Sequence, residues 1–165
     1  MGLVSNTSPL CNLAVIGRLG LVRDQFGEVT IPTAVWEELL IWKHADGRDS
    51  VMAAFQEGWL RVISVSNKEL VRSLQRRLDL GEAEAIALAI ERSATCLLID
   101  ERDGRREASG FGITLTGALG VLIKAKKMGG IDSLYMEIQR LRTMANFRIL
   151  PALEEKLLRE VDEVR

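Results

Sequence analysis

The side chains best suited to chemistry in this sequence are an amide and several acids near the ends of apolar runs. Asn6 and Asp100 each follow such a run, and Asp103 lies three residues beyond Asp100. Glu38 and Glu82 belong to predicted helices. Grouped carboxylates repel one another unless a cation neutralises them. Because Mg²⁺ and Mn²⁺ prefer hard oxygen ligands, these residues predict a divalent metal site that could activate water beside a phosphodiester.

Each acid also has a purely structural interpretation. Glu82 suits the first turn of a helix, where the helix dipole favours negative charge, and Asp100 or Asp103 suits a helix cap. Glu38 suits a solvated helix face. With 23 acids in the chain, spacing alone leaves both interpretations open.

Short apolar runs alternate with helical patterns along the chain. The predicted strands cover residues 3–5, 29–31, 60–63, 95–99 and 113–116. The predicted helices cover residues 9–16, 32–42, 50–56, 67–78, 82–92, 104–109, 118–128, 133–146 and 152–164. Such alternation is typical of an α/β protein with a parallel sheet.

The run 95–99 is apolar throughout, as expected for a strand covered on both faces. We therefore expect a three-layer αβα sandwich around a mostly parallel sheet, with additional C-terminal helices. Ligands of such sheets bind beyond the carboxyl ends of the strands, where Asn6 and Asp100 are predicted to lie.

Composition narrows the class of protein. The 22 Lys and Arg nearly balance the acids and give a net charge of -1, so any contact with nucleic acid must be local. Cys11 and Cys96 lie in apolar stretches without metal-binding spacing, which indicates reduced buried thiols. The sequence lacks a signal peptide pattern or an apolar run long enough to span a membrane, so we expect a cytoplasmic protein with no membrane partner.

Four segments resemble PIN-domain proteins and occur in the order found in that family. They are Ser5–Leu10, Ile31–Leu39, Leu80–Ala89 and Leu98–Arg105. The run Thr116–Gly120 is also similar to a PIN subgroup. Within the family, the sequence most resembles the VapC-type toxin ribonucleases. The resemblance spans residues 3–130, so we expect one PIN-like domain over residues 1–165, with residues 131–165 as a helical extension.

The resemblance implies a metal-dependent ribonuclease, commonly the toxin of a toxin–antitoxin pair, often a homodimer held inactive by a small antitoxin protein. Carried over by position, the residues implied to be catalytic are Glu38, Glu82, Asp100 and Asp103. These four and Asn6 are the implied ligands of Mg²⁺ or Mn²⁺. Ser8 matches a family hydroxyl near the first acid and is an implied substrate-binding residue, and Glu84 is an alternative to Glu82.

Asn6 departs from the family, because a neutral amide replaces an anionic ligand. Metal affinity should fall, and carboxylate repulsion should ease. This leaves two hypotheses open: an active endoribonuclease, or a weak or inactive PIN-fold module that binds RNA or a partner protein. A phosphate-handling domain of the response-regulator kind fits less well, because an acidic pair after the first strand is missing.

Basic residues offer one candidate for substrate binding. Arg105 follows Asp103 closely and is expected to contact RNA phosphates. Lys124, Lys126 and Lys127 fit a solvated helix face better, and His44 fits the surface. The C-terminal helices each have an apolar stripe, which suits packing on the domain or a dimer or antitoxin surface.

Overall fold

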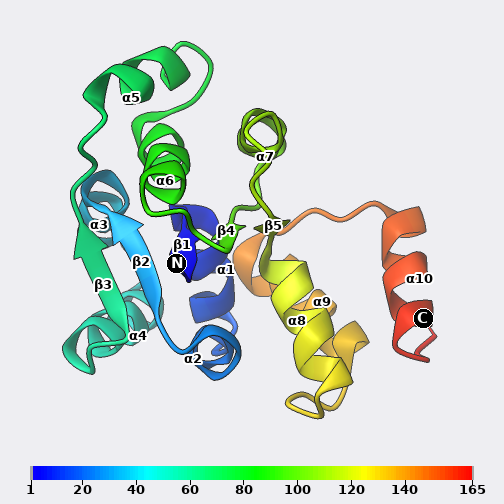
Figure 1. The fold of residues 1–165 in the computed structure, drawn as a ribbon. Coiled ribbons are helices and arrows are strands. Elements are labelled where there is room, and N and C mark those ends of the chain that lie inside the picture. Colours follow the sequence, from blue (N-terminus) through cyan, green and yellow to red (C-terminus); the bar gives the residue numbers. More distant parts are fainter. Residues whose placement is uncertain (1, 165) are drawn as a thin grey trace.

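The computed structural model describes residues 2–164 and has a five-stranded sheet at its centre (Figure 1). The strand order is β3-β2-β1-β4-β5, and every pair is parallel. The strands are β1 (Leu3–Ser5), β2 (Val29–Pro32), β3 (Leu60–Ile63), β4 (Cys96–Leu98) and β5 (Leu115–Thr116). The α/β prediction is confirmed, and the sheet is wholly parallel.

Helices pack on both faces of this sheet. The described residues form α1 (Thr7–Val15), α2 (Gly20–Phe26), α3 (Thr33–Leu40), α4 (Ala45–Gln56), α5 (Lys68–Leu74), α6 (Leu80–Glu91), α7 (Arg102–Ser109), α8 (Ala118–Lys127), α9 (Leu134–Ala145) and α10 (Pro151–Glu160). None of these helices combines the length and apolar character needed to cross a membrane.

Alternation along the strands separates the core into two layers. Leu3 packs in one apolar cluster and Val4 in the other, because successive strand side chains point to opposite faces. The larger cluster joins the sheet to α1, α2, α4, α8 and α9. The smaller one joins it to α5, α6 and α7, which lie together on the other side in Figure 1. Helix α6 is buried along nearly its whole length, as its apolar sequence predicts.

Helices α2 and α4 show the largest differences from the sequence prediction. Helix α2 was not predicted, because only Val22 of its seven residues is fully buried and the apolar pattern is correspondingly weak. Helix α4 begins at Ala45 rather than near residue 50. His44 makes the earlier start possible, because its Nδ1 accepts the Gly47 N–H at 2.9 Å and its ring stacks on Trp42.

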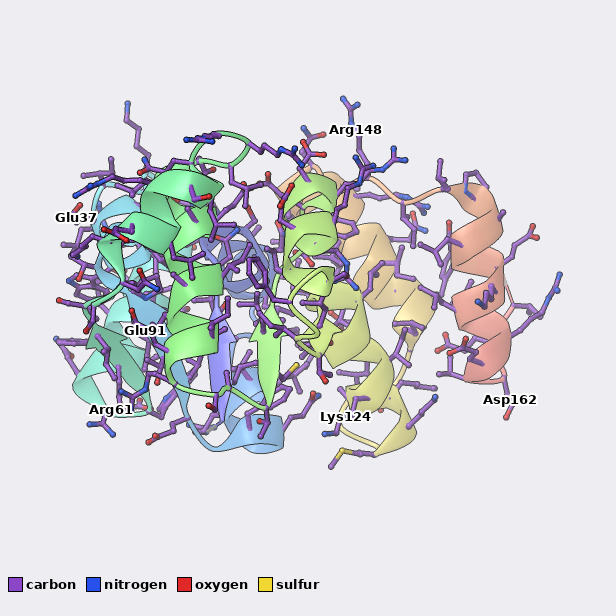
Figure 2. All side chains as sticks on the ribbon, turned by 45° about the horizontal axis from the view of Figure 1, so that its top comes forward. Glu37, Arg61, Glu91, Lys124, Arg148 and Asp162 are labelled. Atoms are coloured by element: carbon purple, nitrogen blue, oxygen red, sulfur yellow. The ribbon has the colours of Figure 1, made fainter. Side chains whose placement is uncertain are left out.

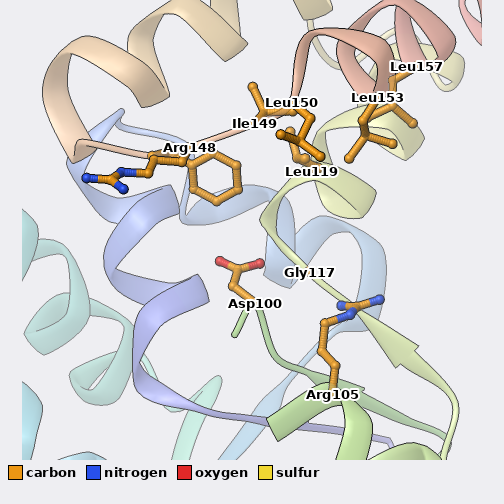
Figure 3. A pocket seen from close by; sticks show the side chains of 10 residues that line it. Asp100, Arg105, Gly117, Leu119, Arg148, Ile149, Leu150, Leu153 and Leu157 are labelled. Atoms are coloured by element: carbon orange, nitrogen blue, oxygen red, sulfur yellow. The ribbon is translucent and has the colours of Figure 1, made fainter. Parts of the chain in front are cut away.

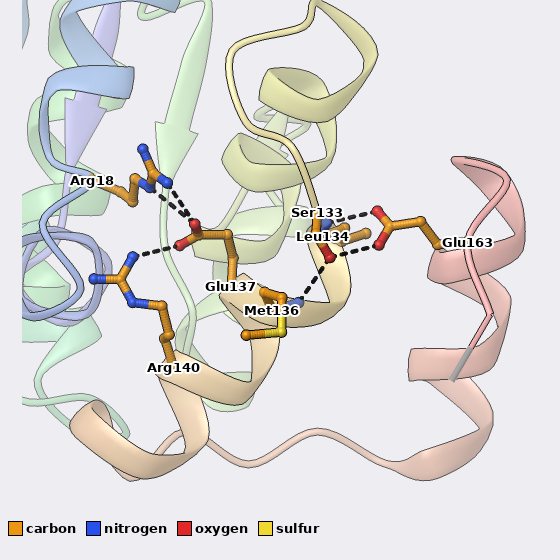
Figure 4. Close-up of polar contacts among 7 residues, drawn as sticks. All are labelled: Arg18, Ser133, Leu134, Met136, Glu137, Arg140 and Glu163. Atoms are coloured by element: carbon orange, nitrogen blue, oxygen red, sulfur yellow. Dashed lines mark hydrogen bonds and ion pairs between the residues drawn. The ribbon is translucent and has the colours of Figure 1, made fainter.

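Polar contacts tie the C-terminal helices to the rest of the molecule (Figure 4). The Arg18 guanidinium donates to Glu137 of α9 at 2.6 Å. Glu163 accepts the Leu134 N–H at 2.6 Å and the Ser133 hydroxyl at 2.9 Å, so a residue beyond α10 caps the start of α9. Helix α10 also holds the fully buried Glu154, which pairs with Arg142.

Candidate functional site

The site lies where the strand order reverses, between β1 and β4. Successive connections run toward β3 on one side of β1 and toward β5 on the other, which makes this pair the switch point where ligands of doubly wound sheets bind. Asn6 follows β1 and is buried, and its N–H donates to the Leu98 carbonyl at 2.9 Å. Asp100 lies just past β4. Asn6 and Asp100 therefore both lie at the carboxyl edge of the sheet, as the sequence predicts.

Asp100 is held by donors from two helices. Its Oδ1 accepts the Ala118 N–H at the start of α8, and its Oδ2 accepts the Asn12 amide of α1, both at 2.8 Å. Burial raises the pKa of Asp100, while these two donors and the nearby Arg105 oppose the rise. The carboxylate also packs so closely on Gly117 that a Cβ there would overlap Oδ1. Glycine at 117 therefore leaves room for the acid.

One face of α1 supplies two of the polar contacts. Ser8 and Asn12 are four residues apart and so share a side of the helix. The Ser8 hydroxyl donates to Glu101 at 3.0 Å, and Asn12 donates to Asp100. No role was predicted for Asn12 or Glu101 from the sequence. The four-residue spacing from Ser8 is the signal that could have identified Asn12.

Glu82 and Glu38 face Glu101 from two other helices. Burial raises the pKa of Glu82 to about 8, and a hydrogen bond to Glu101 together with the negative charges of Asp79 and Glu101 adds to the rise. Burial also raises the pKa of Glu38, and the charges of Asp79 and Glu101 act in the same direction. We call Glu38, Glu82, Asp100 and Glu101 the acid cluster. Its members come from α3, α6 and the segment after β4.

Two further groups complete the surroundings of the acid cluster. Asp79 caps α6 by accepting the Glu82 N–H at 2.8 Å, which fixes the first turn of that helix. The Thr7 hydroxyl is buried without a well-formed hydrogen bond to the described residues, yet it is near enough to Glu38 to oppose the rise in the pKa of that acid. Buried hydroxyl groups usually form a hydrogen bond, and the Thr7 hydroxyl forms none of good geometry.

The structure does not bring every candidate acid to this point. Asp103 is exposed on α7 and lines a separate hollow with Arg77, Arg106 and Glu107. The Glu84 carboxylate faces the start of α3, where it accepts the Ala34 N–H at 3.3 Å. Two residues along a helix point in different directions, so Glu82 rather than Glu84 joins the acid cluster.

Of the basic candidates, Arg105 lies beside the cluster and the lysines lie elsewhere. Arg105 donates to the Ile99 carbonyl at 2.7 Å, which places its guanidinium next to Asp100. Lys126 pairs with Glu163 at 3.6 Å, and Lys124 lies 5.4 Å from the ring centre of Phe26. Figure 2 shows Lys124 at the opposite end of the molecule from Arg148, which lines the same cavity as Asp100.

The acid cluster fits a divalent cation by its chemistry. Its oxygens are the hard ligands that Mg²⁺ and Mn²⁺ prefer. Burial, and after it the neighbouring negative charges, raise the pKa values of Glu38, Glu82 and Asp100, and a bound cation would oppose that rise. Within residues 2–164, no three His, Cys, Asp or Glu side chains already stand at metal-binding spacing. A cation would therefore have to draw the carboxylates closer together.

Comparison with known proteins adds one match. Residues 2–163 match the family DUF3368, which is described as a PIN domain. The matched range includes both C-terminal helices as well as every strand. None of the curated proteins matches the chain.

Proposed function

This chain belongs to the PIN-domain family, a nuclease fold in general, and from that premise we propose that it is a divalent-metal-dependent endoribonuclease that hydrolyses RNA phosphodiester bonds. The observation that carries the proposal is the acid cluster. Helices α3 and α6 direct Glu38 and Glu82 toward Glu101, Asp100 lies beside it after β4, and these three acids have raised pKa values. Raised pKa values in a cluster of partly buried acids are typical of functional residues.

We assign the proposed roles residue by residue. Glu38, Glu82 and Asp100 are the proposed ligands of one or two Mg²⁺ or Mn²⁺ ions, Asn6 is a weaker ligand, and Glu101 joins them. Asp103 remains a proposed outer contributor, since it faces a neighbouring hollow. A bound divalent cation would activate water and stabilise negative charge on the phosphodiester.

The chain's own groups position the reaction around those ligands. Asn12 and the Ala118 N–H orient the two oxygens of Asp100, and Ser8 orients Glu101. Burial and the neighbouring Glu101 raise the pKa of Glu82 to about 8, so the metal-free protein favours the protonated form of Glu82 at neutral pH. Arg105 is anchored on the Ile99 carbonyl, which leaves its remaining N–H groups for a phosphate oxygen.

Replacing Asp100→Asn tests the proposal. Metal-dependent cleavage of RNA should be abolished, because the proposed ligand loses its charge. The fold should persist, because an asparagine still accepts the Ala118 N–H and Asn12 can turn its amide to match. Thermal unfolding checks the fold, and Asp49→Asn on the exposed face of α4 is the matched control. Full activity in Asp100→Asn would exclude this mechanism.

Asn6 supports a second function, that of a catalytically weak PIN-fold module that binds RNA or a partner protein. An amide oxygen offers a cation less than a carboxylate does, so the wild type should need more metal. Asn6→Asp should increase metal affinity and cleavage together, measured by calorimetry and by an RNA cleavage assay. If the wild type binds RNA tightly, cleaves none across Mg²⁺ and Mn²⁺ titrations, and gains nothing from Asn6→Asp, the binding function is the better account.

We further propose that the protein acts in the cytoplasm as a VapC-like toxin, as a homodimer restrained by a small antitoxin protein. The support is the resemblance to toxin ribonucleases in the segments around the acid cluster. A small antitoxin-like gene beside this one, whose product binds the purified protein and stops its cleavage of RNA, is the expected finding. Light scattering of the purified protein tests the dimer.

A further inference from the structure

A cavity of about 420 Å³ opens beside Asp100 and is closed on one side by the C-terminal segment. The linker between α9 and α10 runs past the start of α8 (Figure 1). Its residues Phe147, Ile149 and Leu150 line the cavity together with Leu119 of α8. The volume lies within the range of small-molecule sites. The C-terminal helices therefore do more than cover the core, because they build one wall of a space that reaches the acid cluster.

The two sides of this cavity differ in chemistry (Figure 3). Leu119, Ile149 and Leu150 lie along one side, continued by Leu153 of α10, and they make that wall apolar. Asp100 and Arg105 lie opposite, with the Asp100 carboxylate pointing toward the cavity. An apolar wall thus faces an acid and a guanidinium across one small volume.

The cavity also carries an aromatic ring and a second guanidinium. Phe147 is half-buried, and Arg148 next to it is exposed and forms no ion pair with any of residues 2–164. Proteins that bind single-stranded nucleic acid combine an aromatic surface for the base with arginines for the phosphate. Phe147, Arg148 and Arg105 provide that combination in the cavity that Asp100 of the acid cluster also lines.

We propose that this cavity binds the unstacked base of a nucleotide next to the scissile phosphodiester, so that the enzyme selects single-stranded RNA. This inference rests on the proposed function, because the phosphodiester must lie at the acid cluster for the neighbouring base to reach the cavity. The base stacks on Phe147, and Arg105 and Arg148 bind the flanking phosphates. Bases of a duplex stay stacked and cannot enter, which is the general reason that unpaired RNA is read this way.

The charge of the cavity favours RNA over an apolar peptide. Two guanidinium groups and the Asp100 carboxylate form the polar part of the cavity, and a nucleotide places an aromatic base between two negative phosphates. An apolar peptide would leave Arg148 without a negative partner.

Binding of a short, 5′-labelled single-stranded RNA, measured by fluorescence anisotropy in Ca²⁺ with gels to confirm that the RNA stays intact, tests the inference apart from cleavage. Phe147→Ala should weaken binding by about 5- to 150-fold, the range that loss of a base-stacking ring produces. Phe147→Trp should restore binding, and Phe147→Leu should restore only part of it. Phe111→Ala, which removes an exposed ring on the turn after α7, should change nothing.

Leu150→Asp separates a loss of RNA binding from a loss of folding stability. Leu150 is 74 % exposed and occupies the N-cap position of α10, where it makes no side-chain cap. Aspartate is a preferred N-cap residue, so the variant should unfold at the same or a higher temperature than the wild type. It should nevertheless bind RNA more weakly, because it places a negative charge in the cavity, and Leu150→Lys should not.

The outcomes separate this inference from the proposed function. If the wild type cleaves RNA but Phe147→Ala and Leu150→Asp bind it as the wild type does, the base site is wrong and the nuclease stands. If the variants lose binding while the wild type cleaves nothing, the base site stands without the nuclease. Equal binding of single-stranded and duplex RNA, or binding of an apolar peptide in place of RNA, overturns the base site.

Discussion

Gly117→Ala tests whether the position of Asp100 depends on the missing side chain at residue 117. The backbone at Gly117 is extended, so alanine itself fits the local conformation. The obstacle is space, because the new Cβ would overlap Asp100 Oδ1 and would lie 3.3 Å from the Ile99 carbonyl oxygen and 3.4 Å from Arg105 Nη1. The carboxylate must therefore move away from α8.

Moving the carboxylate breaks its 2.8 Å hydrogen bond from the Ala118 N–H. A hydrogen bond to a charged group contributes about 1.5–3 kcal/mol, so we expect Gly117→Ala to lower the free energy of unfolding by about that amount. For a chain of this size the melting temperature should fall by roughly 3–12 °C. Cleavage should fall by about 10- to 100-fold, as is typical when the support of a metal ligand is lost.

Chemical denaturation and an RNA cleavage assay measure these effects, and a double-mutant cycle assigns their cause. In the Asp100→Ala background the overlap is gone, so Gly117→Ala should cost less than about 1 kcal/mol, well below its cost in the wild type. An equal cost in both backgrounds would refute the reasoning. Gly20→Ala is the control, because its Cβ meets only Arg23 Nη2 at 3.7 Å and alanine favours the helix, so it should stabilise by up to about 1 kcal/mol.

Two other predictions concern charge. Burial alone would raise the pKa of Glu163, but the N–H groups of Leu134 and Tyr135 lower it below its usual value. Its contribution to stability is thus full above the unfolded pKa near 4.5 and is lost as pH falls through the lower folded pKa. Glu163→Gln should therefore cost about 1–2 kcal/mol at pH 7, and thermal melts of both proteins should converge in acid. Asn12→Asp places a second carboxylate against Asp100, so it should lower the melting temperature in EDTA. Added Mg²⁺ should raise the melting temperature of the variant by more than it raises that of the wild type. An equal rise in both proteins would place the ion elsewhere.

The sequence predicts the layers of this fold well because apolar periodicity reports burial directly. All five strands lie within a residue or two of their predicted ranges, and the polar residues after β1 and β4 come together at one edge. Helix α2 escaped prediction because a short helix with one fully buried residue leaves little periodic signal.

The details of the site depend on side-chain directions that spacing alone does not give. Asp103 is near Asp100 in sequence, but α7 begins between them at Arg102 and turns Asp103 outward. Glu101 lies at the centre of the acid cluster because Ser8, Glu82 and Glu38 approach it from separate helices. The cavity beside Asp100 depends on where α10 settles, which is a long-range contact that no local pattern encodes.

The order in which the site is assembled has a consequence for the cell that makes the protein. Strand β4 must insert beside β1 before Asp100 meets Asn12, and the Ala118 N–H that fixes Asp100 belongs to a still later helix. The N-terminal segments leave the ribosome first and cannot complete the acid cluster by themselves. Under the proposed function, a growing chain therefore could not cleave the messenger and ribosomal RNA around it until more than two thirds of its 165 residues had been synthesised.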